Sequence, residues 1–267
     1  MWMSVNRILR GGLFWAALLS LAMTFAEAAP AAEAFRVDTK VYSGGEEEPI
    51  SQTSTLFHEA VIYDFPAEGN EVTIFAPKLG RIVILDTQRR IRTEVSEDRL
   101  YDFSSSLREW AAKQEDGLTQ FAVDPRFDRQ IDAETGNMSF ASRWMTYELR
   151  TMPASTEEMA TQYIKFCDVY SHLNTLLNPG SLPPFGRLEV NRQLQQSTSL
   201  PVEIRLTIPP AKKFGNREIE MVARHRYQDT LSNNDLDRIE KAGVQLTTFR
   251  QVSLSEFRGV KSTAESR

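Results

Sequence analysis

Cysteine and histidine are scarce in this 267-residue sequence, which contains one cysteine and three histidines. A single thiol cannot form an intramolecular disulfide, so core burial must stabilise the fold. Cys167 falls inside a predicted helix, and we interpret it as a small buried hydrophobe and not as a bridge to a second chain. His58, His172 and His225 are far apart in the sequence and show no HExxH or Cys/His spacing, so no metal site is predicted.

Motifs for nucleophilic catalysis and nucleotide binding are also missing. The sequence contains no GxSxG turn, no P-loop and no GxGxxG. Ser104 to Ser106 are expected on the wet side of a helix, and Asp168 and His172, four residues apart, are expected to form an ordinary surface hydrogen bond. We therefore predict no catalytic residue, no cofactor and no metal ligand. A hydrolase site made of two carboxylates stays open, because such a pair needs no motif in sequence.

An excess of positive charge is absent as well. The formal net charge is −5, which argues against a general nucleic-acid binder. The cluster Arg89-Arg90-Ile91-Arg92 is interpreted as the solvent side of a strand, in preference to a phosphate or lipid contact. With 41% apolar and 25% charged residues, the composition is that of a globular protein.

The first 28 residues have the pattern of a secretory signal peptide. Arg7 and Arg10 precede an apolar segment from Leu13 to Phe25, and Ala26-Glu27-Ala28 is a small-x-small cleavage pattern. We predict cleavage after Ala28 and an exported protein, periplasmic or secreted; the alternative is an uncleaved anchor. No other apolar run is long enough to cross a bilayer, so no transmembrane segment is predicted in the mature chain. Residues 29–257 are predicted to form a single exported α+β domain, and residues 258–267 a disordered tail.

Alternation of apolar and polar residues predicts strands connected by short polar turns, which is typical of an antiparallel sheet. The clearest series is Glu71 to Val95, with three strands in succession. Its block from Ile82 to Leu85 is apolar on both faces, so the second face must meet another layer, a ligand or a partner. The other predicted strands are Phe35–Ser43, Ser54–Phe65, Ser142–Thr151, Arg187–Leu194, Pro201–Ile208 and Glu218–Gln228.

Helical spacing with capping residues predicts three helices. The first is capped by Ser96 and ends at Asp116-Gly117, and the second begins with a capping box of Ser155 and Glu158 and ends at Asn178. The third opens at Ser232, with Asp235 three residues on. The predicted fold is therefore α+β: a curved, mainly antiparallel sheet of about nine strands covered by about three amphipathic helices.

The strand series, and above all VILDTQRRIRTEV (Val83 to Val95), resembles a strand turn of the periplasmic lipoprotein-carrier superfamily. The resemblance implies a curved, incomplete antiparallel barrel whose helices close an apolar cavity for acyl chains. An apolar small molecule or lipid would then be the partner. No functional residue of that family is carried over to this chain.

Three functions are therefore considered. The first is an exported, non-enzymatic binding protein that holds a lipid or other apolar ligand between sheet and helices. The alternatives are a structural or partner-binding protein of the cell envelope, with an unidentified protein partner, and a hydrolase whose carboxylates are not visible as a motif.

Overall fold

The computed structural model describes residues 34–178, 181–210 and 216–259. The predicted signal peptide, its cleavage point after Ala28 and all but the first two residues of the predicted tail lie outside the described residues.

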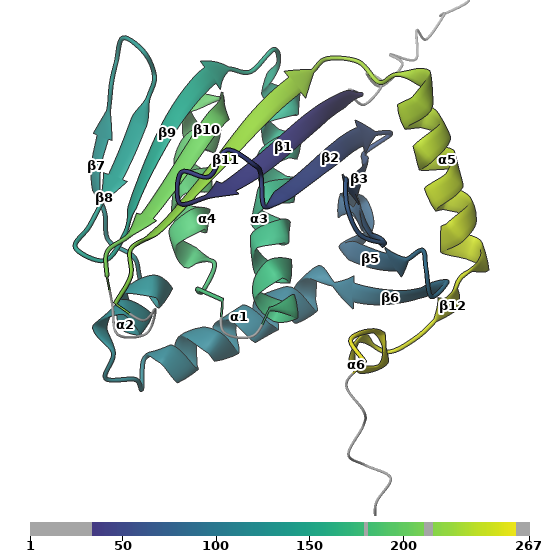
Figure 1. Ribbon diagram of the computed structural model, residues 1–267, viewed down its shortest axis with the longest axis horizontal. Coiled ribbons are helices and arrows are strands. Elements are labelled where there is room, and N and C mark those ends of the chain that lie inside the picture. The colour runs from purple at the N-terminus through teal and green to yellow at the C-terminus, as the bar shows by residue number, and fades with distance from the viewer. Residues whose placement is uncertain (1–33, 179–180, 211–215, 260–267) are drawn as a thin grey trace, which may run out of the picture. The chain divides into compact units, whose positions relative to one another are not determined.

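Twelve strands of the described residues form one sheet, in which all neighbours are antiparallel except one short parallel pair at an edge (Figure 1). The sheet is open, because its two outermost strands, β12 and β7, do not pair with each other. The α+β class and the mainly antiparallel sheet are confirmed, whereas the expected count of about nine strands is wrong. In spatial order the strands are β12 (Arg250–Gln251), β6 (Ile91–Ser96), β5 (Arg81–Asp86), β4 (Glu71–Ala76), β3 (Val61–Pro66), β2 (Ser51–His58), β1 (Phe35–Ser43), β11 (Ile219–Gln228), β10 (Ser199–Ile208), β9 (Thr146–Pro153), β8 (Met138–Ala141) and β7 (Asp128–Ile131).

The series from Glu71 to Val95 forms the three predicted strands, β4, β5 and β6, with the 3-10 turn Pro77–Leu79 between the first two. The single strand predicted over Ser54–Phe65 is wrong: β2 and β3 form a hairpin through Glu59 and Ala60. Both residues have positive φ, 49° and 60°. Two-residue hairpin turns of this kind usually carry Asn or Gly, so the sequence lacked the ordinary turn signal.

Six α-helices occur in the described residues, and three were predicted. Figure 1 shows α4 packed along the strands at one end of the sheet, α3 across its middle and α5 beside the strands of the other end. The helices are α1 (Glu97–Ala111), α2 (Gly117–Val123), α3 (Glu157–Leu177), α4 (Phe185–Ser197), α5 (Asn233–Thr248) and α6 (Leu254–Phe257).

The strand predicted over Arg187–Leu194 is wrong, since these residues belong to α4. The buried residues of α4 include Gly186, Val190 and Leu194, which are four residues apart and therefore lie on one helical face. In this short segment, the alternation of apolar and polar residues predicted the secondary structure less well than the four-residue spacing did.

Helix ends were predicted with mixed success. Ser96 caps α1 as expected, accepting a hydrogen bond from the backbone N–H of Arg99, but α1 ends at Ala111 and Asp116 begins the separate helix α2. The N-cap of α3 is Thr156, not Ser155, and its side chain accepts from the N–H of Met159. The capping box of Ser232 and Asp235 at α5 is confirmed.

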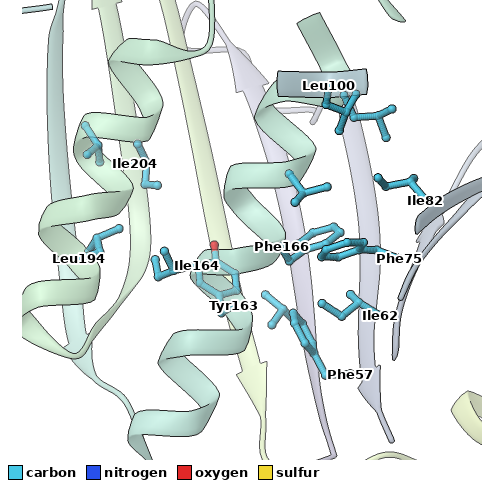
Figure 2. Packing of buried hydrophobic residues seen from close by; sticks show 14 of the residues in the cluster. Phe57, Ile62, Phe75, Ile82, Leu100, Tyr163, Ile164, Phe166, Leu194 and Ile204 are labelled. Atoms are coloured by element: carbon cyan, nitrogen blue, oxygen red, sulfur yellow. The ribbon is translucent and has the colours of Figure 1, made fainter. Parts of the chain in front are cut away.

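The two faces of the sheet are covered by different helices, and each covered face has its own apolar cluster. The inner cluster joins the sheet to α1, α2, α3, α4 and α6. The outer cluster joins β2 to β5 with α5. Figure 2 shows Phe166 of α3 directed at the sheet, where its ring lies edge-on to Phe57 at 6.0 Å between centroids. The inner face is thus the one on which α3 lies.

Candidate ligand-binding site

Two cavities lie between the inner face of the sheet and α3. The first, here called the apolar pocket, has a volume of about 270 Å³ and lies against β1, β10 and β11. The second, the polar cavity, has a volume of about 640 Å³ and lies against β2 to β5. Tyr170 and Asn174 of α3 line both cavities, so the two adjoin the same helical residues.

The floor of the apolar pocket is a continuous apolar patch on three adjacent strands. Val41 of β1 pairs with Ala223 of β11, which pairs in turn with Ile204 of β10. Met221 and Leu206 form the next pair along the same strands. All of these residues except Ile204 are only half-buried. The helices therefore leave apolar side-chain surface uncovered inside the fold, which is where an apolar ligand gains most from burial.

The remaining walls are supplied by the loop that leads into α4 and by β9. Leu182, Pro183 and Pro184 line the pocket from the loop, and the two prolines restrict its backbone. Tyr147 of β9 is buried, and burial raises the pKa of its phenol to about 12. The phenol is therefore neutral at ordinary pH and adds no charge to the wall.

Arg187 is the charged residue among those that line the apolar pocket. It stands in the first turn of α4, where its Nε donates to Oδ1 of Asn191 at 2.7 Å. Asn191 Nδ2 in turn donates to Oδ1 of Asp168 at 2.7 Å. In the described part of the chain no carboxylate forms an ion pair with Arg187 within 4.0 Å, so Asp168 is reached only through the amide. These two hydrogen bonds fix the position of the guanidinium, but no carboxylate in the described ranges neutralises its charge directly.

Among the groups around Arg187, Asp168 has a pKa that burial raises and that Asn191 and the charge of Arg187 partly lower, and the others are neutral. Burial, and then the positive charge of Arg187, lower the pKa of His225 to about 3. Burial also raises the pKa of the Cys167 thiol, and the buried phenols of Tyr163 and Tyr227 have pKa values raised well above 10.0 for the same reason. Cys167 is half-buried beside the inner cluster and is a free thiol.

The polar cavity has Asp64 at its floor, on β3. The Asp64 side chain is buried and accepts a hydrogen bond from Thr55 Oγ1 at 2.7 Å. Burial raises the pKa of Asp64 to about 6, against hydrogen bonds from Thr55 and Thr53 that lower it. The other acidic and basic residues among the described ones that line this cavity are Glu68, Glu71, Asp86 and Arg258.

Asp86 is held by a turn. Its Oδ1 accepts the backbone N–H groups of Gln88 and Arg89 at 3.0 and 2.7 Å, and its Oδ2 accepts Arg89 Nε at 2.5 Å. Burial raises the pKa of Asp86, but the bonds from Arg89 and Gln88 outweigh this and lower it. Asp64 and Glu71 lie on adjacent strands of the same face.

The surface hydrogen bond predicted between Asp168 and His172 is wrong. Asp168 accepts from Asn191, and the buried His172 has its Nδ1 2.6 Å from Ser104 Oγ. His225 Nδ1 lies 3.0 Å from Thr39 Oγ1, and His58 is on β2. Within the described ranges no group of three or more His, Cys, Asp or Glu side chains could hold a metal ion.

Ser104 corrects the expectation that Ser104 to Ser106 form a wet helical side. Its side chain is 3% exposed, whereas Ser105 and Ser106 are exposed as predicted. The hydroxyl packs against His172 of α3, whose pKa is lowered by burial. Ser104 is therefore part of the contact between α1 and α3 and not a nucleophile open to solvent.

In the basic cluster Arg89-Arg90-Ile91-Arg92, the arginines contact other residues of the same chain. Arg89 pairs with Asp86 and lies over the ring of Phe257 at 5.0 Å, and Arg92 hydrogen bonds to Glu94. Arg90 is exposed, as the solvent-side interpretation expected.

No family model matches this sequence, and a search of curated proteins finds no match either. The resemblance to lipoprotein carriers therefore stays a prediction. Among the described residues, no helix combines the length and the apolarity that crossing a membrane requires.

Arg187 and Asp64 are the site residues that reasoning from the sequence missed. Arg187 was assigned to a strand, and the signal that would have placed it is the four-residue spacing of Gly186, Val190 and Leu194 after two prolines. The signal at Asp64 is a carboxylate inside the apolar strand VIYDFP, on the same face as the buried Ile62.

Proposed function

We propose that this protein is a non-enzymatic binding protein that holds a lipid or other apolar ligand between the sheet and the helices. One observation carries the proposal: the floor of the apolar pocket consists of half-buried apolar side chains on β1, β10 and β11. Pockets of this kind, mostly apolar with a few placed polar groups, are typical of small-molecule sites. Export of the chain, predicted from its first 28 residues, would make this an extracytoplasmic carrier or receptor.

The size of the pocket limits what it takes. A volume of about 270 Å³ is near the lower end for ligand sites, which begin at roughly 300 Å³. A single alkyl chain fits this description, and each buried methylene contributes about 0.8 kcal/mol. A chain of a dozen carbons would thus provide several kcal/mol of binding free energy even after ordering costs.

The test is direct binding of a neutral apolar probe, N-phenyl-1-naphthylamine, followed by its fluorescence, together with solvent extraction and mass spectrometry of the purified protein. Ala223→Phe places a ring in the pocket floor and should weaken probe binding by about tenfold or more, equivalent to about 1.4 kcal/mol. Leu206→Trp, from the neighbouring strand, is a second filling variant with the same expected result.

Ala133→Phe is the matched control, because Ala133 is exposed and does not line the pocket. It should bind the probe as the wild type does, with all variants showing the wild-type circular dichroism spectrum. Absence of both probe binding and a copurifying apolar molecule, or undiminished binding by two folded filling variants, would contradict the proposal.

A further inference from the structure

Arg187 places a positive charge in the wall of an otherwise apolar pocket. Among the described residues that line the apolar pocket there is no aspartate, glutamate or lysine. A guanidinium is protonated at all ordinary pH values, and removing it from water is costly unless a partner compensates the charge. Since no carboxylate of the described residues pairs with Arg187, that partner is missing from the part of the chain that the structure describes.

The contacts of Arg187 leave most of its donors unused. A guanidinium has five N–H groups, of which Nε–H is engaged by Asn191. The Cys167 thiol is a further but weak partner, and the neighbouring tyrosines are neutral. The two terminal nitrogens present the fork that binds a carboxylate or phosphate through two parallel hydrogen bonds.

The electrostatics of the two cavities give an orientation. Asp64, Glu68, Glu71 and Asp86 line the polar cavity, against one arginine, Arg258. A negatively charged head is repelled from that cavity and attracted to Arg187. Tyr170 and Asn174, which line both cavities, mark the boundary between these opposite environments.

We infer that the ligand of the apolar pocket is an amphiphilic anion whose oxyanion head pairs with Arg187 while its alkyl chain lies on β10 and β11. This inference rests on the proposed function and adds the chemical class of the ligand. A fatty carboxylate is the simplest member of the class, and an alkyl phosphate shares the same head chemistry.

The deciding experiment compares ligands of equal chain length on the unaltered protein. Dodecanoate, its methyl ester, dodecanol and dodecyl phosphate each displace the neutral probe, and the four dissociation constants are measured at pH 7. A charge-assisted pair predicts that an anionic ligand binds at least about tenfold more tightly than the ester and the alcohol. Which anion binds more tightly distinguishes a carboxylate head from a phosphate head.

Two variants of α4 then assign the effect to Arg187. Arg187→Met should reduce the anion's affinity by about tenfold or more and leave that of dodecanol within about twofold, while Arg187→Lys should retain part of the preference. Arg192→Met is the matched control on the same helix, because Arg192 is exposed and pairs with Glu189; it should bind all ligands like the wild type.

The outcomes separate the two proposals. Equal affinity for acid, ester and alcohol in the wild type would overturn the inference and leave the apolar site in place, as would an anion preference that survives in a folded Arg187→Met protein. Failure of all four ligands and of the neutral probe to bind would overturn the proposed function itself.

Discussion

Asp64 is a carboxyl group inside an apolar strand. Its neighbours on β3 are Ile62 and Phe65, which are 2% and 8% exposed, and Asp64 itself is 5% exposed. Hydrogen bonds from Thr55 and Thr53 favour the charged carboxylate, but they do not outweigh the loss of hydration on burial. The environment therefore favours the protonated form.

This raised pKa has a consequence for stability. The pKa of Asp64 rises from 3.8 to about 6 on folding because of burial, so between these values the native state binds more protons than the unfolded state. The free energy of unfolding then falls as pH rises from about 4 to about 6. Asp64→Asn removes the free-energy cost of ionising this buried carboxyl. At pH 7 the variant should therefore be more stable than the wild type by up to about 3 kcal/mol.

Urea unfolding at several pH values between 4 and 7 measures the effect. Asp128→Asn, at an exposed position of β7, is the control and should follow the wild-type pH dependence. The prediction is wrong if Asp64→Asn is no more stable than the wild type at pH 7 and its free energy of unfolding has the same pH dependence. Ionisation of Asp64 would then not destabilise the folded protein.

At the scale of elements, the start of α3 shows how adjacent residues compete for one role. Ser155 and Thr156 are both N-cap residue types, and the sequence favoured Ser155 because Glu158 stands three residues later. In the structure Thr156 adopts the extended cap conformation and accepts from Met159 N at 3.1 Å. Ser155 is exposed, with its Oγ 3.4 Å from the carboxylate oxygens of Asp229.

Paired alanine substitutions test this assignment. Thr156→Ala removes the cap of the long helix α3 and should lower the free energy of unfolding by about 1 kcal/mol. Ser155→Ala should change it by less than about 0.5 kcal/mol, as is usual for exposed sites. Chemical denaturation of both variants measures the difference, and a larger loss for Ser155→Ala would restore the original assignment.

Elements differed in how far their sequences determined them. The strands from Glu71 to Val95 and the α5 capping box were predicted correctly, because alternation and cap spacing are local properties of these residues. The helix α4 was not predicted, because the eight residues from Arg187 to Leu194 fit the two-residue period of a strand as well as the 3.6-residue period of a helix. Packing of Val190 and Leu194 in the inner cluster decides for the helix. The hairpin at Glu59-Ala60 was missed because its residues carry no turn preference.

At the scale of the molecule, β5 is one of the strands whose two faces belong to different layers. Ile82 and Ile84 belong to the inner cluster, and Val83 and Leu85 to the outer cluster. The second apolar face of this block is therefore covered by α5, not left for a ligand or a partner. Arg36 of β1 adds a polar contact to this layer, since its Nη1 donates to Oδ1 of the buried Asp235 at 3.0 Å.

A chain that ends at Leu231 lacks α5, β12 and α6, so it should lose this outer layer together with Val252, Leu254 and Phe257 of the inner cluster. Leu56, Val72, Ile74 and Leu85 would then face water, and fully exposing each buried aliphatic side chain costs about 1.5 to 3 kcal/mol. We expect aggregation or loss of the cooperative thermal transition, together with binding of the dye ANS.

A chain that ends at Gly259 is the control for this truncation, because it retains every described helix and strand. It should unfold at the temperature of the full-length protein. A monomeric chain ending at Leu231 with an unchanged cooperative transition would mean that α5 is not needed to cover the sheet.

The sequence by itself determined the α+β class, the three successive strands from Glu71 to Val95 and the apolar character of both faces of Ile82 to Leu85, because periodicity and turn length are local. Only the tertiary structure decided which helix covers each face, that Ser104 is buried against His172, and that Arg187 stands in an apolar pocket where no carboxylate of the described residues pairs with it. These features depend on residues far apart in the chain, such as Val41, Leu206 and Tyr170, whose proximity is set by strand order and helix packing. The candidate site is therefore a product of the packing and not of any motif.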